Sequence, residues 1–190
     1  GSNMGFTGSG ELDNGIGVAL GIYHANTNSY TETNVQITVP SLGTFQVDQG
    51  SSGTGIDRFD DVTPTVWEES HGAGVATGID TVAGVSGGAN IEYTPNMLPD
   101  GLTGRIAFSP AVAGAKSGDK ASSGDDGSSK GSGVDVVLSA DGSILGMDGL
   151  TIMAGISNVE QDAAASSIYG DVDERVIAFK YAMGAFTIGA

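Results

Sequence analysis

Cysteine is absent from this chain of 190 residues, and long hydrophobic runs are absent as well. Without cysteine, the chain has neither a disulfide framework nor a thiolate metal site. Without a run of about 18 apolar residues, it has no transmembrane helix. Aromatic residues make up only 6% of the chain, with a single tryptophan. What remains is a chain of small, polar and aliphatic residues, and its organisation has to be read from their order.

Basic residues are scarce. The chain has 7 lysines and arginines against 23 aspartates and glutamates, which gives a formal net charge of −16. Nucleic acid is a poor candidate ligand, because its phosphates need basic partners. A cation or a cationic solute suits this charge better.

The chain is rich in glycine, with 32 residues, and apolar residues alternate with polar or small ones. In one segment Val134, Val136 and Leu138 oppose Asp135 and Ser139. This is the period of a β-strand with two unlike faces. Segments of this kind recur along the chain and predict an all-β protein with about ten strands.

The connections between these segments differ in length. Connections 40–43 and 95–101 are short and have turn sequences, whereas 50–88, 110–132 and 158–173 are long and polar. Outer-membrane barrels sort their connections in this way, with short turns at one end and long loops at the other. Such a barrel must also close, because lipid cannot satisfy an open sheet edge.

The face opposite the apolar one carries polar side chains on most segments. They are Asn34, Gln36, Thr38, Glu92, Thr94, Arg105, Asp135, Glu174 and Lys180. A small soluble barrel fills its interior with apolar side chains, so this face indicates a water-filled interior. The alternative is a soluble antiparallel sheet with one solvated face.

The length of the chain does not match a complete pore. A conducting barrel needs about 16 strands, which at roughly 20 residues for each strand and its connection exceeds this chain. We therefore expect residues 1–190 to form a single partial β-barrel domain of a longer protein.

Four stretches occur in this order: FTGSGELDNGIGVALGIYH, SLGTFQVDQGSSGTGIDRFDDVTPTVWEES, IEYTPNMLPDGLTGRIAFSP and DGLTIMAGIS. Together they resemble the general-diffusion porins of marine alphaproteobacteria over nearly the whole chain. The resemblance implies a transmembrane antiparallel β-barrel of about sixteen strands. It also implies homotrimers in the outer membrane of a Gram-negative bacterium, surrounded by its lipid. The C-terminal aromatic residue on which such barrels usually end is missing here.

The same resemblance implies that segment 50–88 is a constriction loop folded into the pore. Thr63 and Pro64 predict the start of a short helix, and Trp67 on that helix is the expected anchor against the inner wall. Arg105 and Lys180 are the wall candidates, because each is the lone cation on the polar face of its strand. The loop would then place its acidic side chains near the lumen: Asp57, Asp60, Asp61, Glu68 and Glu69. Acids facing a basic wall set a transverse field across a pore.

A calcium-binding site is a second interpretation of this acidic segment. Asp57, Asp60 and Asp61 are close enough in sequence to share one hard cation through their oxygens. The spacing of an EF-hand is absent. Calcium is therefore kept as the one candidate cofactor, with these three aspartates as its candidate ligands.

Catalytic interpretations find little support. The stretch GSSKG (127–131) matches a nucleophile-elbow pattern, but a low-complexity loop surrounds it. His24 and His71 are the only histidines, and neither has an evident partner in the sequence. The sequence therefore predicts a pore for passive diffusion of small hydrophilic solutes and ions, with a preference for cations, and not an enzyme. The alternative is an acidic, extracellular, β-rich surface protein or adhesin that binds calcium.

Overall fold

A computed structural model describes the following residues: 4–24, 30–49, 53–60, 62, 82–112, 130–161 and 171–190. The strands are β1 (Met4–Glu11), β2 (Gly17–His24), β3 (Tyr30–Val39), β4 (Gly43–Asp48), β5 (Asn90–Pro95), β6 (Leu102–Ser109), β7 (Lys130–Asp141), β8 (Leu150–Gln161), β9 (Val172–Met183) and β10 (Phe186–Gly189). Short 3₁₀ helices are η1 (Gly55–Phe59), η3 (Gly84–Gly87) and η5 (Gly142–Leu145).

The ten strands form one antiparallel sheet in chain order, from β1 to β10. This confirms the prediction of an all-β chain with about ten strands. β1 and β10 are the two edges, and the described residues contain no pairing between them. Within the described residues, no helix is long and apolar enough to cross a membrane.

Short turns join the strands at one end of the sheet, and the turn residues explain their geometry. Between β1 and β2, the side chain of Asn14 accepts a hydrogen bond from the Ile16 N–H at 3.2 Å. After β7, the Asp141 side chain accepts from the Ser143 N–H at 2.8 Å and caps η5. Asparagine and aspartate favour turns for this reason, because their side chains bond the backbone two residues on.

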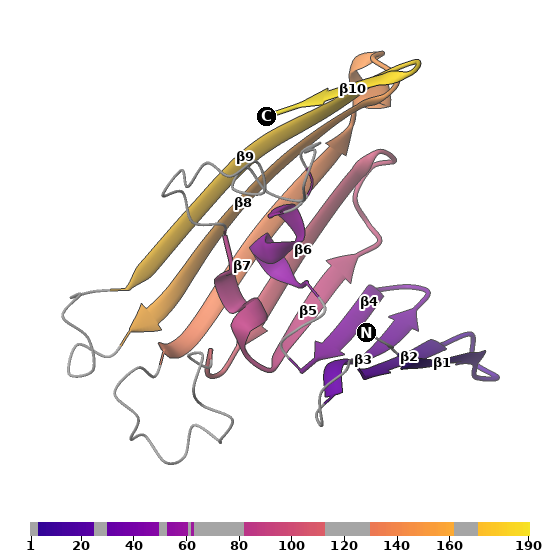
Figure 1. The fold of residues 1–190 in the computed structure, drawn as a ribbon. Coiled ribbons are helices and arrows are strands. Elements are labelled where there is room, and N and C mark those ends of the chain that lie inside the picture. The colour runs from indigo at the N-terminus through magenta and orange to yellow at the C-terminus, as the bar shows by residue number, and fades with distance from the viewer. Residues whose placement is uncertain are drawn as a thin grey trace.

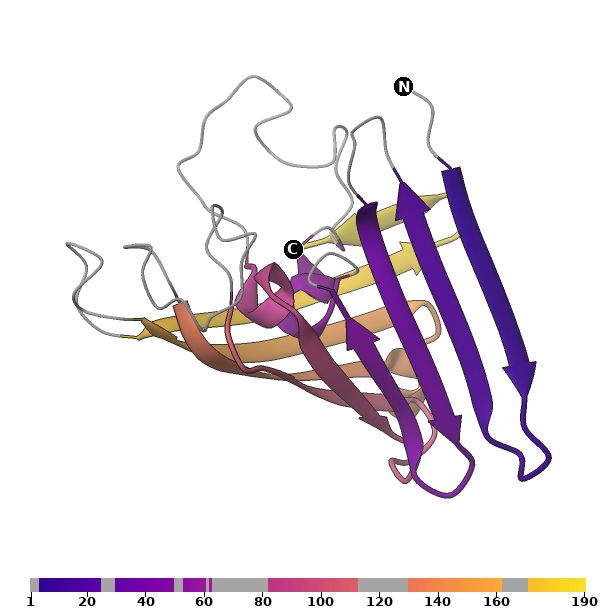
Figure 2. The same ribbon diagram turned by 90° about the horizontal axis from the view of Figure 1, so that it is seen from below.

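The sheet is twisted and curved into a trough (Figure 1). In the second view β1–β4 run at a steep angle to β7–β10, so the sheet turns strongly between its two edges (Figure 2). η1 and η3 lie on the concave side, against the central strands, in both views. The concave side is thus partly covered by the two ends of segment 50–88.

Strand register keeps the outward-facing side chains aligned across the sheet. One row runs through Val18, Ile37, Phe45, Tyr93, Ile106, Val136 and Ile156. Within it the rings of Phe45 and Tyr93 stack with centroids 4.7 Å apart. The row crosses from β2 to β8, so the apolar residues form a continuous surface and not isolated spots.

This convex surface is exposed. Ile177 is 82% exposed, Ile156 56% and Val136 43%. Towards the end with the long connections the surface becomes polar, where the Asn158 side chain donates to Asp173 at 3.0 Å. The convex side therefore carries an apolar belt with a polar margin.

The buried core lies on the other side, beneath η1 and η3. Ile56 and Phe59 of η1 pack against Val137, Met153 and Ala178 of the sheet. A second cluster joins Val85 of η3 to Ala107, Val112 and Val159. The polar pattern of the sequence predicted that the whole concave face is in contact with water. That prediction is wrong for the part of the face that the described ends of segment 50–88 cover.

Candidate functional site

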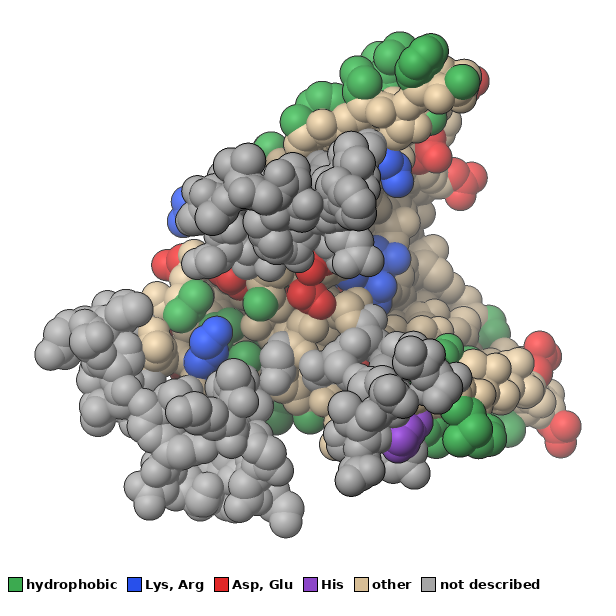
Figure 3. Space-filling model, in the orientation of Figure 1, with side chains coloured by type: hydrophobic (Ala, Val, Ile, Leu, Met, Phe, Trp, Pro, Cys, Tyr) green, Lys and Arg blue, Asp and Glu red, His purple; other side chains and the backbone are tan. Residues whose placement is uncertain are grey.

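η1 and η3 contact each other and lie on β6, β7 and β8. They are the first and last described parts of segment 50–88. Charged side chains gather around this central part of the concave side, whereas hydrophobic ones appear mainly along its margins (Figure 3). The candidate site is the contact between these two short helices and the polar face of the sheet.

Both helices bond to one buried carboxylate. Asp135 on β7 has 0% of its surface exposed. Its Oδ2 accepts hydrogen bonds from the backbone N–H groups of Ile56, at 2.9 Å, and Val85, at 3.2 Å. Because Ile56 and Val85 belong to opposite ends of segment 50–88, Asp135 ties both ends to the sheet.

Two further carboxylates hold the helices from either side. Glu92 Oε2 on β5 accepts from the Gly55 N–H at 2.7 Å. Glu174 Oε2 on β9 accepts from the Gly84 N–H at 2.6 Å. We call Glu92, Asp135 and Glu174 the wall carboxylates.

The wall carboxylates lie in one row across the sheet. Register pairs Glu92 with Ala107, Ala107 with Asp135, Asp135 with Ser157, and Ser157 with Glu174. The three acids therefore lie on β5, β7 and β9. Adjacent strands are about 4.8 Å apart, so neighbouring acids of the row are about 10 Å apart. Ala107 and Ser157 between them are small and leave room for the backbone of the helices.

The hydrogen bonds have a simple cause. The first N–H groups of any helix lack acceptors within the helix. At Gly55, Ile56, Gly84 and Val85 these groups are turned toward the sheet and away from water, where an unpaired donor is costly. Carboxylates are the strongest acceptors that a side chain can supply.

Glycine is required where the helices approach Asp135. Gly55 and Gly84 have φ angles of 60° and 54°, which L side chains rarely adopt. A Cβ atom would lie 2.1 Å from Asp135 Oδ2 at Gly55 and 2.2 Å from it at Gly84. The backbone of η1 and η3 can therefore approach Asp135 this closely only because Gly55 and Gly84 lack a side chain.

A polar cavity of about 370 Å³ opens beside η1, over β3–β6. Arg58 of η1 donates from Nε and Nη2 to Glu92, at 3.1 and 2.5 Å. Arg105 of β6 lies with Nε 3.7 Å from the same carboxylate. The lining residues are Asn34, Gln36, Thr44, Gln46, Arg58, Glu92, Thr94 and Arg105.

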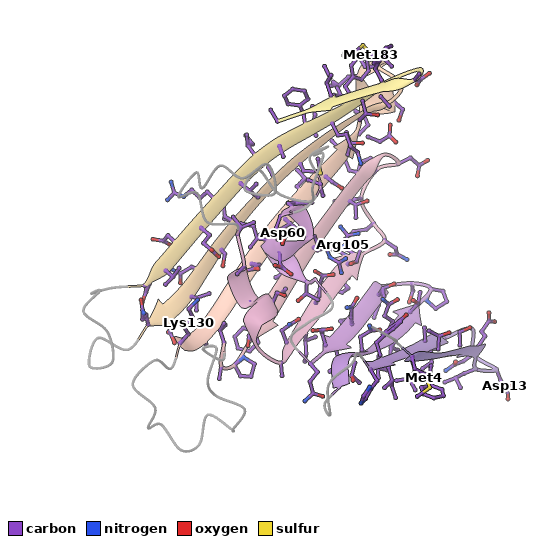
Figure 4. All side chains as sticks on the ribbon, viewed as in Figure 1. Met4, Asp13, Asp60, Arg105, Lys130 and Met183 are labelled. Carbon is purple, nitrogen blue, oxygen red and sulfur yellow. The ribbon has the colours of Figure 1, made fainter. Side chains whose placement is uncertain are left out.

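The structure places some of the residues that the sequence singled out. Asp57 accepts a hydrogen bond from the Ser86 hydroxyl at 2.8 Å, which joins η1 to η3. Asp60, half-buried after η1, and Arg105 both appear over the central strands (Figure 4). Lys180 is exposed on β9, in register with Thr151 towards the turn end, and lines no part of the cavity.

Other expected residues lie outside the described part of the chain: Asp61, Trp67, Glu68 and Glu69. The three-aspartate calcium site includes Asp61 and so falls outside it as well. Among the described residues, no group of three His, Cys, Asp or Glu side chains could hold a metal ion.

The sequence interpretation missed the role of Glu92, Asp135 and Glu174. It placed them on a wet face, whereas Glu92 is 2% and Asp135 0% exposed beneath the segment that they hold. It also overlooked Arg58 as the partner of Glu92. One signal was present, since the three acids sit on alternate strands of the polar face with small residues between them.

Comparison with known proteins adds no family. No protein-family model matches the chain, and no curated protein matches it in sequence.

Replacing Asp135 with alanine tests the central contact. The N–H groups of Ile56 and Val85 would lose their acceptor, and we expect Asp135→Ala to cost about 2–4 kcal/mol. Asp135→Asn keeps one acceptor and should cost less. Urea titration of the purified protein gives the free energies of unfolding. Asp173→Ala, on the exposed side of β9, is the control, and an equal loss there would contradict the assigned role.

Replacing Gly84 with alanine tests the close approach. The added Cβ would meet Asp135 Oδ2 and also Ile56 Cγ2 at 2.5 Å, and we expect roughly 2 kcal/mol of extra strain. The ends of segment 50–88 should then leave the sheet more often, and trypsin should cut after Arg58 about tenfold faster or more. Gly146→Ala is the matched control, because Gly146 has a φ of 69° but open space around it. Equal cleavage in both variants would refute the steric explanation.

Proposed function

We propose that this chain is part of an outer-membrane pore of the general-diffusion porin type, through which small hydrophilic solutes and ions pass without chemistry. One observation carries the proposal. The same sheet exposes an apolar belt on its convex side and a polar face on its concave side, and the ends of a long connection lie on the polar face.

The belt is difficult to explain in water. Large apolar side chains such as Val136, Ile156 and Ile177 are exposed in adjoining strands, and Val136 and Ile156 are in register. Monomeric soluble proteins rarely expose contiguous apolar patches of more than a few hundred Å². Lipid is the partner that a continuous apolar surface on alternate strand positions fits best.

Strand length is compatible with a bilayer. β7, β8 and β9 have 12 residues each, and a crossing takes about 9–11 tilted residues. The polar margin at Asn158, Asp173 and Arg175 marks where the belt ends on β8 and β9.

The proposal requires the sheet edges to be paired, because hydrocarbon cannot satisfy the N–H and C=O groups of β1 and β10. We propose that further strands of the complete protein close the barrel, and that segment 50–88 narrows it. Homotrimers in the outer membrane follow from the porin resemblance. The chain's net charge of −16 supports a preference for cations.

Conductance in a planar lipid bilayer is the direct test. The intact polypeptide, purified in detergent, should insert and give discrete, ohmic current steps. A protein that stays dispersed without detergent and gives no steps would overturn the pore and would favour the acidic surface protein considered from the sequence.

Substitution in the belt tests contact with lipid. Leu138→Arg should cost about 2–4 kcal/mol of folding free energy in a bilayer, because Leu138 is 45% exposed in the belt, its row continues through Ala154 to Ile177, and a charged side chain facing hydrocarbon loses its hydration. Leu145→Arg is the control, since Leu145 is 62% exposed in η5, at the turn end. Unfolding in urea from lipid vesicles gives both values, and equal values would show that Leu138 does not face hydrocarbon.

Ion preference tests the acidic segment. In a gradient of potassium chloride the reversal potential should favour K⁺ over Cl⁻. Asp60→Lys should reduce that preference, because it changes the charge by two units at the end of η1. The measurement is the permeability ratio, with Asp13→Lys in the exposed turn after β1 as the control. An unchanged ratio in Asp60→Lys would place Asp60 away from the ion path.

A further inference from the structure

The polar cavity beside η1 holds two guanidinium groups and one carboxylate. We propose that it is a binding subsite for small carboxylate solutes that pass through the pore. This inference rests on the proposed function, and it assigns a substrate class to one place on the pore wall.

The charge inside the cavity is positive, although the chain as a whole is strongly acidic. Among the described residues of the lining, Glu92 is the one acid, and it faces both Arg58 and Arg105. Its Oε2 also accepts the Gly55 N–H. The Glu92 carboxylate thus interacts with two guanidinium groups and a backbone donor, and the described lining residues carry an excess of one positive charge.

Arg105 supplies the unused donors. Its ion pair with Glu92 runs through Nε at 3.7 Å, which is too long for a hydrogen bond. Within the described part of the chain, its two terminal nitrogens donate to no acceptor. The side chain is 24% exposed toward the cavity, so it is accessible to a solute. A guanidinium with free terminal nitrogens matches a carboxylate with two parallel hydrogen bonds.

The rest of the lining is polar and uncharged, which suits the remainder of a hydrophilic solute. Gln36 donates to Gln46 at 3.0 Å, and the hydroxyl of Thr44 lies 3.0 Å from that of Thr38, which is outside the lining. These bonds fix the amides and hydroxyls along β3 and β4. Asp48 follows the lining residue Gln46 on β4, but it is 2% exposed and does not line the cavity, so its charge is not counted there.

The volume of the cavity is large enough for a small solute. About 370 Å³ is at the lower end of the range for ligand pockets, which begins near 300 Å³. A short mono- or dicarboxylate fits this volume and its surplus of positive charge. In a lumen that otherwise favours cations, such a cavity would give an organic anion a place to bind on its way through.

Equilibrium binding tests the subsite without requiring a pore. Isothermal titration calorimetry of the detergent-solubilised, intact polypeptide should show saturable binding of succinate, weaker binding of acetate and none of the neutral analogue acetamide. Arg105→Gln should weaken succinate binding about tenfold or more, because it removes the bidentate donor. Arg105→Lys, which keeps the charge but loses the planar pair of donors, should fall between.

Lys180→Gln is the matched control. It removes a cation from the same polar face, but outside the cavity, and should leave succinate affinity unchanged. Equal succinate affinity in Arg105→Gln and the unchanged protein would overturn the subsite, as would an equal loss in Lys180→Gln. Inorganic phosphate that binds more tightly than succinate would overturn the assignment to carboxylates.

The two proposals fail separately. Current steps in a bilayer without succinate binding would overturn the subsite alone. Succinate binding that depends on Arg105, in a protein that gives no current, would overturn the pore and support the subsite. If Arg105→Gln does not fold, as judged by its urea titration, the comparison between Arg105→Lys and Lys180→Gln decides the question.

Discussion

A polypeptide segment can lie on a β-sheet only if its backbone N–H groups find acceptors there, because contact with the sheet removes water from them. In this protein the acceptors are three carboxylates in one cross-strand row, Glu92, Asp135 and Glu174. They meet the first N–H groups of η1 and η3, which no helix satisfies internally. The position of both ends of segment 50–88 depends on this contact.

The same contact changes the electrostatics of the concave side. Each wall carboxylate faces backbone donors, and Glu92 also faces an arginine. Their negative charge is therefore directed at the protein and not at the open space. Among the described residues, Arg58 and Arg105 outnumber the acid beside them, so this part of a chain with a net charge of −16 is locally positive.

The sequence predicts the strands well because alternation is a local property. Val134, Asp135 and Val136 alternate in the chain just as they alternate across the sheet, and turn residues such as Asn14 mark the ends. The row of wall carboxylates is not local. Gly55 and Glu92 are far apart in the chain, and only the register of the intervening strands brings Glu92, Asp135 and Glu174 into line. Side-chain periodicity predicts which face a residue lies on, but not which residues lie opposite one another.

Alternation also couples the two sides of the sheet. On β7, Val136 belongs to the convex belt and its neighbour Asp135 to the concave row. A slip of one residue in the pairing of β7 would turn Asp135 toward the belt and Val136 toward η1, because side chains change face at every residue. Both the apolar surface and the contact with segment 50–88 would be lost together. The contact between segment 50–88 and Asp135 therefore stabilises the pairing register of β7, on which the convex apolar belt also depends.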